Sequence, residues 1–548
     1  MTKTKEKLTT KYTDKLPHAT QSVCPECSTN GNIEILPAIV FEEDGKIWIT
    51  RKCKKHGIIK EIYWEDANMY NKMRKYGYDG KGIENPNTKK VTGQCPLDCG
   101  LCPRHKSHTA LANIVVTNRC DLSCWYCFFY AKENDSVYEP TIEQLRFMMK
   151  NLRNMRPVPA NAIQLTGGEP TIRDDIIDII KIAKAEGFNH IQLNTHGIIL
   201  SQNLKLTKAV RKAGVNTIYM SFDGVTPKTN PKNHWESAGA IENCRKANIG
   251  IVLVPTIIRG VNEQEAGAII NFALNHIDVI RGVNFQPVSL VGRMPRKLRE
   301  RQRITISGLI KIIEEQTNGL ICKEDFYVVP CMGAITRFVE SITKKNEYSL
   351  STHFACGAAT YLFLDREKVI PITRFIDVTG FLEYLDEKAK EIEAGKNRYW
   401  VALKVLKKLN SFIDKEKQPK GLNIYKIIYN ALLKHNYDAL GKFHKSSLFI
   451  GMMHFMDMYN YDTERVQRCN IHYAMADGRI VPFCSFNVFP ERYRDIVQKQ
   501  FSIPANVWNK KYPEKNINIK YKRDIKKLES SKVYKKIYGN LKNFFMIK

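Results

Sequence analysis

Three cysteines in a C-x3-C-x2-C spacing, Cys120, Cys124 and Cys127, constrain this chain more than any other feature. The spacing suits a 4Fe–4S cluster, which normally takes four cysteine ligands, so that one iron stays open to another ligand. Residues 111–117 before it are apolar and β-branched, which predicts a buried strand. The cysteine loop therefore follows the carboxyl end of a strand.

A second apolar run, residues 162–166, ends in Gly167-Gly168-Glu169-Pro170. Glycines at a strand end let the backbone approach a ligand closely. In this order the two motifs resemble those of the radical S-adenosylmethionine (SAM) superfamily. The resemblance implies that the methionine part of SAM chelates the open iron, that Gly167–Pro170 hold its amino end, and that one electron releases a 5′-deoxyadenosyl radical. A structural zinc or redox cluster loop is the alternative interpretation.

Strand-like and helical stretches alternate between residues 111 and 288. The predicted strands are 111–117, 162–166, 190–195, 217–222, 250–257 and 282–288, and the predicted helices are 141–155, 174–186, 204–213, 237–247 and 263–276. Six apolar runs separated by helices predict parallel strands joined by right-handed crossovers. The expected fold is therefore α/β, a partial (β/α)6 TIM-like radical SAM barrel.

Active groups of such barrels lie at the carboxyl ends of the strands. By family position, Asn194, Thr195 and Ser221 would contact the ribose or carboxylate of SAM. Each of these side chains could equally cap the end of a strand.

The N-terminal region carries its own metal-ligand pattern, Cys24, Cys27, Cys53 and His56. Two cysteine knuckles joined by a β-hairpin are how small ribbons assemble a tetrahedral four-ligand site. We expect one mononuclear zinc or iron here.

A second C-x3-C-x2-C triplet, Cys95, Cys99 and Cys102, follows a polar stretch rather than a strand. We assign it to an auxiliary cluster, with His105, His108 or a distant cysteine as possible fourth ligand. Four later cysteines, Cys331, Cys356, Cys469 and Cys484, look like the auxiliary-cluster extensions of the superfamily. A scattered cysteine is usually a small buried hydrophobe, which is the alternative. With the SAM cluster, the prediction is three 4Fe–4S clusters.

The length of 548 residues exceeds a single core. We predict five segments: a metal ribbon (1–90), an auxiliary-cluster segment (91–110), the SAM barrel (111–300), an auxiliary-cluster and substrate domain (301–490) and a basic extension (491–548). Fifteen cysteines without a secretory signal favour a reducing compartment and metal ligation. The sequence holds no apolar run long enough to span a membrane.

The formal net charge is +29, and residues 491–548 hold 16 Lys or Arg against 5 Asp or Glu. Such charge attracts nucleic acid, anionic lipid or an acidic protein, or reflects a Lys-rich proteome. For the extension, we weigh a solvated surface against a basic shelf for a phosphate-bearing substrate.

One branch of the superfamily shares further motifs with this chain, Cys95–Lys106, Asn118–Phe128 and Arg468–Tyr473 followed by Pro482-Phe-Cys484. From about residue 24 to 490 the chain resembles the archaeal tetraether lipid synthases. The resemblance implies carbon–carbon bond formation between terminal methyl groups of phytanyl chains of archaeal diether phospholipids. It also implies a ferredoxin-like electron donor and a cytoplasmic enzyme held peripherally at the inner membrane surface, with no nucleic acid partner.

Two alternatives are kept open. The same motif set resembles radical SAM methyltransferases that act on a reduced pterin, which predicts a compact polar pocket instead of an apolar channel. A non-catalytic zinc and Fe–S protein that binds nucleic acid through its charge would show salt-dependent binding and no SAM cleavage.

Overall fold

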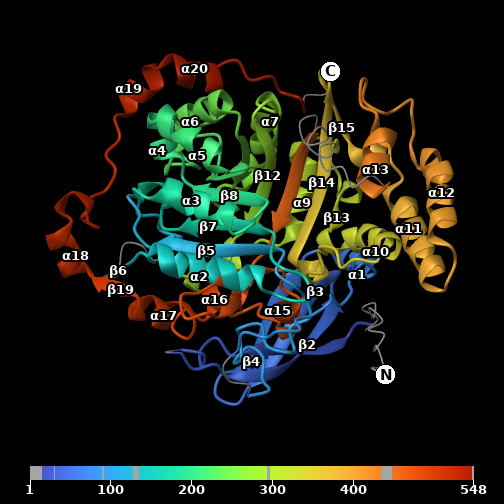
Figure 1. Ribbon diagram of the computed structural model, residues 1–548, viewed down its shortest axis with the longest axis horizontal. Coiled ribbons are helices and arrows are strands. Elements are labelled where there is room, and N and C mark those ends of the chain that lie inside the picture. Colours follow the sequence, from blue (N-terminus) through green and yellow to red (C-terminus); the bar gives the residue numbers. More distant parts are fainter. Residues whose placement is uncertain are drawn as a thin grey trace.

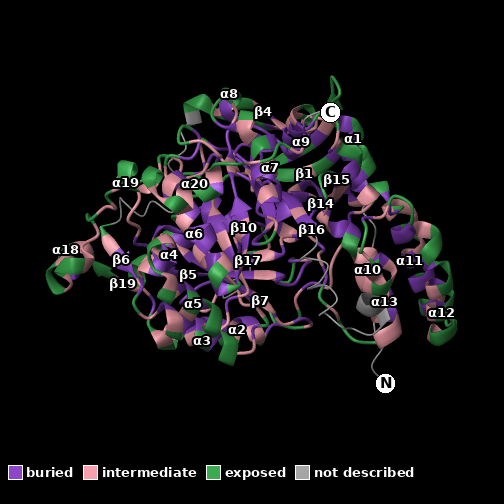
Figure 2. Cartoon of the chain, turned by 90° about the horizontal axis from the view of Figure 1, so that it is seen from above, coloured by how far each residue is buried: buried purple, intermediate pink, exposed green. Residues whose placement is uncertain are grey.

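Eight parallel strands lie side by side at the centre of the computed structural model, which describes residues 15–29, 31–88, 92–127, 135–292, 296–433 and 447–545. Their order is β17-β5-β7-β8-β9-β10-β12-β16. The strands are β5 (Leu111–Thr117), β7 (Ala162–Gly167), β8 (His190–Thr195), β9 (Thr217–Ser221), β10 (Gly250–Val254), β12 (Ile280–Pro287), β16 (Ser447–Met453) and β17 (Ile471–Ala474). Figure 2 shows this sheet as the buried centre of the molecule.

The six strands predicted between residues 111 and 288 are confirmed, with ends that shift by two or three residues at most. The strand expected at residues 250–257 is divided into β10 and a short β11 (Thr256–Ile257). Residues 112–117 of β5 are all buried, which explains why this strand reads as a continuous apolar run.

Helices occupy each predicted interval between these strands, as Figure 1 shows. They are α2 (Ile142–Arg153), α3 (Ile176–Ala185), α4 (Ile198–Gln202), α5 (Leu204–Ala213), α6 (His234–Ala247) and α7 (Ala266–Asn275). Helix α2 begins with a capping box, because Thr141 and Gln144 each bond the other's backbone N–H. The short helix α4 is the one that the sequence pattern missed.

The partial barrel itself is not confirmed by the topology. The C-terminal half of the chain adds strands at both edges of the sheet, which contains 13 strands in the described residues. These are β13 (Tyr327–Val328), β14 (Gly357–Asp365) and β15 (Lys368–Pro371) beside β16, and β18 (Ile480–Pro482) beside β17. The Met-rich run that begins at Leu448 forms most of β16. The five predicted segments stay a prediction.

The N-terminal region forms a separate four-stranded antiparallel sheet (blue in Figure 1). Its elements are β1 (His18–Val23), β2 (Ile35–Glu43), β3 (Lys46–Cys53) and β4 (Gly57–Trp64), followed by α1 (Ala67–Arg74). The buried Arg51 of β3 donates to the carbonyl of Tyr459, and Tyr63 of β4 donates to Asp462. These hydrogen bonds attach the small sheet to the C-terminal half.

Helices dominate the remaining parts of the chain. Five of these helices come after β12 in the chain: α9 (Ile306–Gln316), α10 (Gly333–Thr343), α11 (Val378–Glu393), α12 (Arg398–Leu409) and α13 (Ile424–Leu433). The C-terminal part contains α16 (Phe483–Val488), α17 (Arg494–Gln500), β19 (Ser502–Pro504), α18 (Ala505–Lys511), α19 (Ile525–Ser530) and α20 (Lys532–Tyr538).

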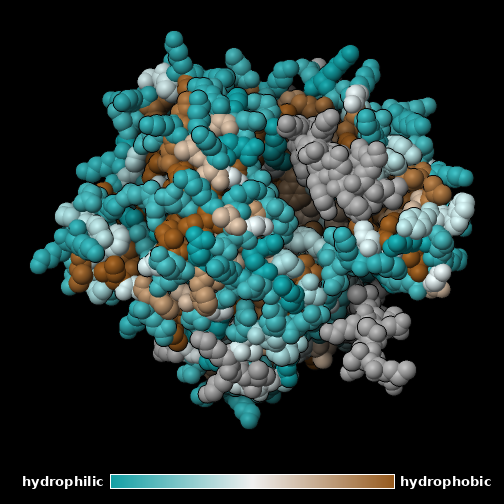
Figure 3. Space-filling view, in the orientation of Figure 1, coloured by the Kyte–Doolittle hydropathy of each residue, from teal (hydrophilic) through white to brown (hydrophobic). Residues whose placement is uncertain are grey.

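Among the described residues, none of the helices is both long and apolar enough to cross a membrane. Hydrophilic side chains cover most of the face drawn in Figure 3, in keeping with the charge of the chain.

Candidate active site

A cavity of about 230 Å³ lies at the carboxyl ends of the parallel strands, where the sequence placed the site. We call it the central cavity. All three cysteines of the first triplet line it, together with Gly167, Gly168 and Glu169 and the predicted residues Asn194, Thr195 and Ser221. The two motifs that are about forty residues apart in sequence therefore share one cavity.

We call residues 118–127, which carry the three cysteines, the cluster loop. Gly167 and Gly168 bring the second motif against the start of this loop. Gly168 N donates to Thr117 O (2.8 Å), and Glu169 N donates to Arg119 O (2.8 Å). A Cβ atom would lie 2.0 Å from Thr117 O at Gly167 and 2.1 Å from Arg119 O at Gly168. Gly167 also has a φ of +142°. The glycines are thus required for contact between two backbone segments. The role expected from the sequence was a close approach of the backbone to a ligand.

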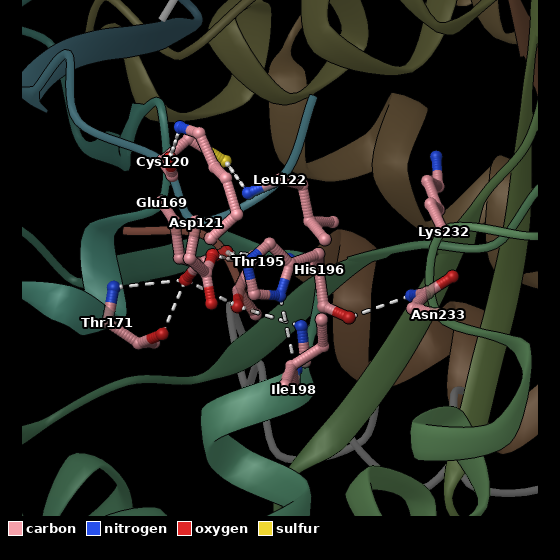
Figure 4. A network of polar contacts seen from close by, with 12 residues as sticks. Cys120, Asp121, Leu122, Glu169, Thr171, Thr195, His196, Ile198, Lys232 and Asn233 are labelled. Atoms are coloured by element: carbon pink, nitrogen blue, oxygen red, sulfur yellow. Dashed lines mark hydrogen bonds and ion pairs between the residues drawn. The ribbon is translucent and has the colours of Figure 1, made fainter. Parts of the chain in front are cut away.

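Glu169 is fully buried, and its carboxylate is saturated by groups of the chain itself. It accepts hydrogen bonds from Thr171 N (3.0 Å), Thr195 Oγ1 (2.7 Å) and His196 N (2.9 Å). Figure 4 shows these donors converging on the carboxylate. Glu169 therefore organises the strand ends. That Gly167–Pro170 hold the amino end of SAM stays a prediction.

His196 joins the two motifs and was not selected from the sequence. Its Nε2 atom lies 2.7 Å from Asp121 Oδ1 and 3.2 Å from Glu169 Oε2. Burial alone would lower the pKa of His196, but the charges of Glu169 and Asp121 hold it well above its usual value. Because Nδ1 of the ring accepts from Ile198 N (3.2 Å), His196 bridges the two carboxylates through Nε2 next to Cys120.

The other predicted SAM contacts are also fixed by neighbouring strands. Asn194 Nδ2 donates to Thr166 Oγ1 (3.0 Å), and the backbone carbonyl of Ser221 accepts from Asn233 Nδ2 (2.7 Å). Thr195 Oγ1 is engaged by Glu169 and Gly197, so its side chain serves as a strand-end cap. Their contacts with SAM stay predictions.

A charged pair on the opposite side of the cavity was missed as well. Lys232 lines the cavity, and its Nζ atom lies 2.6 Å from Asp223 Oδ2. Tyr126 of the cluster loop donates to the same carboxylate. Burial raises the pKa of Cys124 to about 12, and the charge of Lys232 opposes that rise. A lysine in a loop carries no sequence signal for this position.

Cys24, Cys27, Cys53 and His56 come together as predicted for a mononuclear metal. His56 Nδ1 lies 3.4, 3.4 and 3.6 Å from the sulfur atoms of Cys24, Cys27 and Cys53, and Cys27 and Cys53 are 3.7 Å apart. A tetrahedron with metal–sulfur bonds of about 2.3 Å has edges of about 3.7 Å. The donor set therefore fits one zinc or iron ion.

Cys95, Cys99 and Cys102 line a second, small cavity together with His105. His105 is buried, and burial lowers its pKa to about 4, so its imidazole is neutral as a metal ligand requires. His108 instead accepts from Ser349 N (3.3 Å). The auxiliary cluster stays a prediction, in which His105 is now the better placed of the two histidines.

The second auxiliary set is only partly assembled. The charge of Cys484 raises the pKa of both Cys469 and Arg465. Arg465 Nε in turn donates to Cys356 Sγ (3.3 Å). Cys331 lines a different cavity, beside Tyr76, Tyr78 and Gly333. Cys331 thus lies apart from the cavity that Cys484 lines, and the second auxiliary cluster stays a prediction. Long sequence spacings gave no means to separate Cys331 from the other three cysteines.

Three thiols, a Gly-Gly-Glu turn and polar strand ends around one cavity suit a 4Fe–4S cluster with bound SAM. The model of the Radical SAM superfamily matches residues 114–273, and that of the HMPTM N-terminal zinc ribbon domain matches residues 16–65. The protein is thus a radical SAM enzyme with an N-terminal zinc ribbon domain.

The chain is 48% identical to the 7,8-dihydro-6-hydroxymethylpterin dimethyltransferase of Methanocaldococcus jannaschii over 501 residues, 90% of this chain and 97% of that protein. It belongs to the family of that protein. The finding overturns the prediction of lipid coupling between phytanyl chains and corresponds to the pterin alternative. The archaeal phospholipid substrate falls with that prediction, whereas the peripheral membrane location stays a prediction.

Two other relatives cover only part of the chain. The GTP 3′,8-cyclase of Clostridium acetobutylicum is 29% identical over 38% of this chain and 65% of that protein. The structure of Streptococcus suis SuiB bound to S-adenosylmethionine aligns with a TM-score of 0.27 at 14% identity, over 33% of this chain and 39% of that one.

Proposed function

We propose that this protein is a radical SAM methyltransferase that acts on a reduced pterin. The observation that carries the proposal is the extensive identity to a protein named for that activity. Cys120, Cys124 and Cys127 would hold the 4Fe–4S cluster, and Asn194 and Ser221 would contact SAM. When bound, the cluster and SAM supply a 5′-deoxyadenosyl radical, which abstracts hydrogen from carbon.

The lining of the central cavity supports a polar heterocycle as substrate. Amide side chains face it from several strands: Asn113, Gln164, Asn194, Asn284 and Gln286. A pterin presents ring nitrogens, an amino group and a carbonyl at its edge, which amides recognise through paired donors and acceptors. Asn113 Nδ2 is a buried donor for which the described residues provide no hydrogen-bond acceptor. A bound ligand would supply one, since buried polar groups are normally paired.

Aromatic rings form a further part of the cavity wall, beside Asn113, because Tyr473 of β17 pairs with Asn113 of β5. Phe455 and Phe483 line the cavity with stacked rings whose centroids are 3.9 Å apart, and the Tyr473 ring lies 5.3 Å from that of Phe483. A flat heterocycle can stack on such a wall while its edge meets the amides. A cavity lined by both amides and aromatic rings would suit a flat heterocycle with a polar edge.

Product analysis tests the proposal. The full chain, loaded anaerobically with iron and sulfide, is incubated with SAM, dithionite and 6-hydroxymethyl-7,8-dihydropterin, and the pterins are analysed by mass spectrometry. We expect pterin carrying one or two additional methyl groups, together with 5′-deoxyadenosine and methionine from one SAM molecule. A second SAM molecule donates the methyl group and yields S-adenosylhomocysteine, with dithionite supplying the electrons. Formation of 5′-deoxyadenosine from SAM with no methylated pterin would reject the substrate while leaving the enzyme class intact.

A further inference from the structure

The basic C-terminal extension runs along the outside of the sheet as a strap, which we define as residues 505–545 (red in Figure 1). Just before its start, β19 pairs with β6 (Ser136–Tyr138), and the first residue of the strap, Ala505, donates from N to Asp135 O (2.7 Å). At its end, Asn318 Nδ2 donates to Phe545 O (2.7 Å). The strap is therefore fixed to the body of the molecule at both ends.

Between these ends, three consecutive residues of the cluster loop meet the strap. The Arg119 guanidinium lies over the Trp508 ring, 5.1 Å from its centroid. Lys520 Nζ donates to Cys120 O (2.8 Å), and Tyr521 N donates to Asp121 O (2.9 Å). Two of these contacts lie at Cys120, the first predicted cluster ligand, and at Asp121, the partner of His196.

The next strap residues keep Lys520 in place. Arg523 forms an ion pair with the fully buried carboxylate of Glu236 (2.5 Å), and it donates to the carbonyl oxygens of Pro231 (3.0 Å) and Lys232 (2.6 Å). A buried bidentate or multiply bonded arginine is a costly contact to break. Lys520 also donates to Ile517 O (3.2 Å) of its own segment, which restricts its side chain.

We propose that the strap positions the cluster loop, with Lys520 as the residue that holds Cys120 and places a positive charge beside the iron–sulfur cluster. Hydrogen bonds and net charge around a cluster set its reduction potential. A fixed ammonium stabilises the reduced, more negative state and so favours the electron transfer that SAM cleavage needs. The inference rests on a cluster at Cys120, Cys124 and Cys127, and it is independent of the pterin.

The experiment uses the full chain loaded with iron and sulfide. Lys520→Met removes the donor and its charge, Lys520→Arg retains both, and Lys522→Met changes a neighbouring exposed lysine as the matched control. Amide hydrogen exchange of residues 119–122 and the midpoint potential of the SAM-responsive signal in electron paramagnetic resonance are measured for each variant.

We expect about tenfold faster exchange in Lys520→Met, because a charged hydrogen bond that restrains local opening is lost. Its midpoint potential should be more negative than that of the wild type, while Lys520→Arg and Lys522→Met stay close to it. Unchanged exchange or an unchanged potential in Lys520→Met overturns the proposal. A loaded wild type without a SAM-responsive signal overturns it too, whereas failure to methylate a pterin leaves it standing.

Discussion

His196 Nε2 lies 2.7 Å from Asp121 Oδ1, which links the end of strand β8 to the cluster loop. The same imidazole lies 3.2 Å from the buried Glu169 carboxylate. Replacing His196 by Gln removes the imidazole that bridges two carboxylates. We expect the free energy of unfolding to fall by about 3 kcal/mol, as for other broken buried pairs, and the thermal midpoint to fall with it.

His190, at the other end of the same strand, provides the control for that variant. His190→Gln changes a partly exposed side chain and should alter stability by about 0.5 kcal/mol or less. A His196→Gln protein as stable as His190→Gln would show that the His196 side chain does not hold the two motifs together.

The close backbone approach at Gly168 makes a second prediction. In Gly168→Ala the added Cβ would lie 2.1 Å from Arg119 O, so strand β7 and the cluster loop must separate. We expect a loss of more than about 3 kcal/mol of stability and a loss of iron measured after reconstitution.

Gly260→Ala is the comparison for that glycine. Gly260 has a φ of +75° and no neighbouring atom within 4 Å of an added Cβ, so it isolates the cost of the left-handed backbone at about 1 kcal/mol. Equal effects of the two substitutions would contradict the tight contact at Gly168.

The ribbon site makes a third prediction. Cys53→Ser should remove one metal atom per chain, because three ligands that remain do not complete the tetrahedron. The backbone amides of β3, the strand that carries Cys53, should then exchange faster, since metal binding stabilises the ribbon. Elemental analysis and hydrogen exchange measure the two effects. Full metal content in Cys53→Ser would exclude this residue as a ligand.

The contact between α6 and the strap should depend on pH. His234 Nε2 lies 2.9 Å from the hydroxyl of Tyr534, and burial lowers the pKa of His234 to about 4. Glu265 and Glu529 oppose that shift, while Arg523 adds to it. The pKa of His234 in the folded state lies below the unfolded value of about 6.5. The stabilising contribution of neutral His234 is therefore present above pH 6.5 and is lost as pH falls toward 4.

Hydrogen exchange of residues 532–538 at several pH values tests this dependence. Exchange, corrected for its intrinsic pH dependence, should accelerate between pH 6.5 and 4 in the wild type. His234→Gln should remove most of that dependence. The same acceleration in His234→Gln would assign it to another group.

Periodicity was sufficient to predict the strands and helices around the central cavity, because each strand is a short local apolar run and each helix an amphipathic one. The two cysteine and glycine motifs also fell correctly at strand ends. Local patterns could not place β17 next to β5, since parallel neighbours 360 residues apart are paired only by the tertiary fold.

The site residues that the sequence missed share one property. His196, Lys232 and Lys520 each act through a partner to which no motif spacing connects them: Asp121, Asp223 and the Cys120 carbonyl. A single histidine or lysine has no spacing that would reveal such a partner. For the same reason, the spacing of Cys331 could not show that it lines a cavity different from that of Cys484.

The substrate assignment can be examined through one amide. Asn113→Leu removes the unpaired donor in the central cavity, and Asn189→Leu changes an exposed residue elsewhere as its control. We expect pterin methylation to fall about tenfold in Asn113→Leu, because a polar edge of the substrate loses its partner. Unaltered methylation in this variant would place the pterin outside the amide-lined cavity.

The formation of 5′-deoxyadenosine by a cysteine variant tests the assignment of the radical SAM site most directly. Cys124→Ala, loaded with iron and sulfide and reduced with dithionite, should form none, while Cys244→Ala, which alters a buried cysteine of α6, should match the wild type. Cleavage of SAM by Cys124→Ala at the wild-type rate would contradict the assignment.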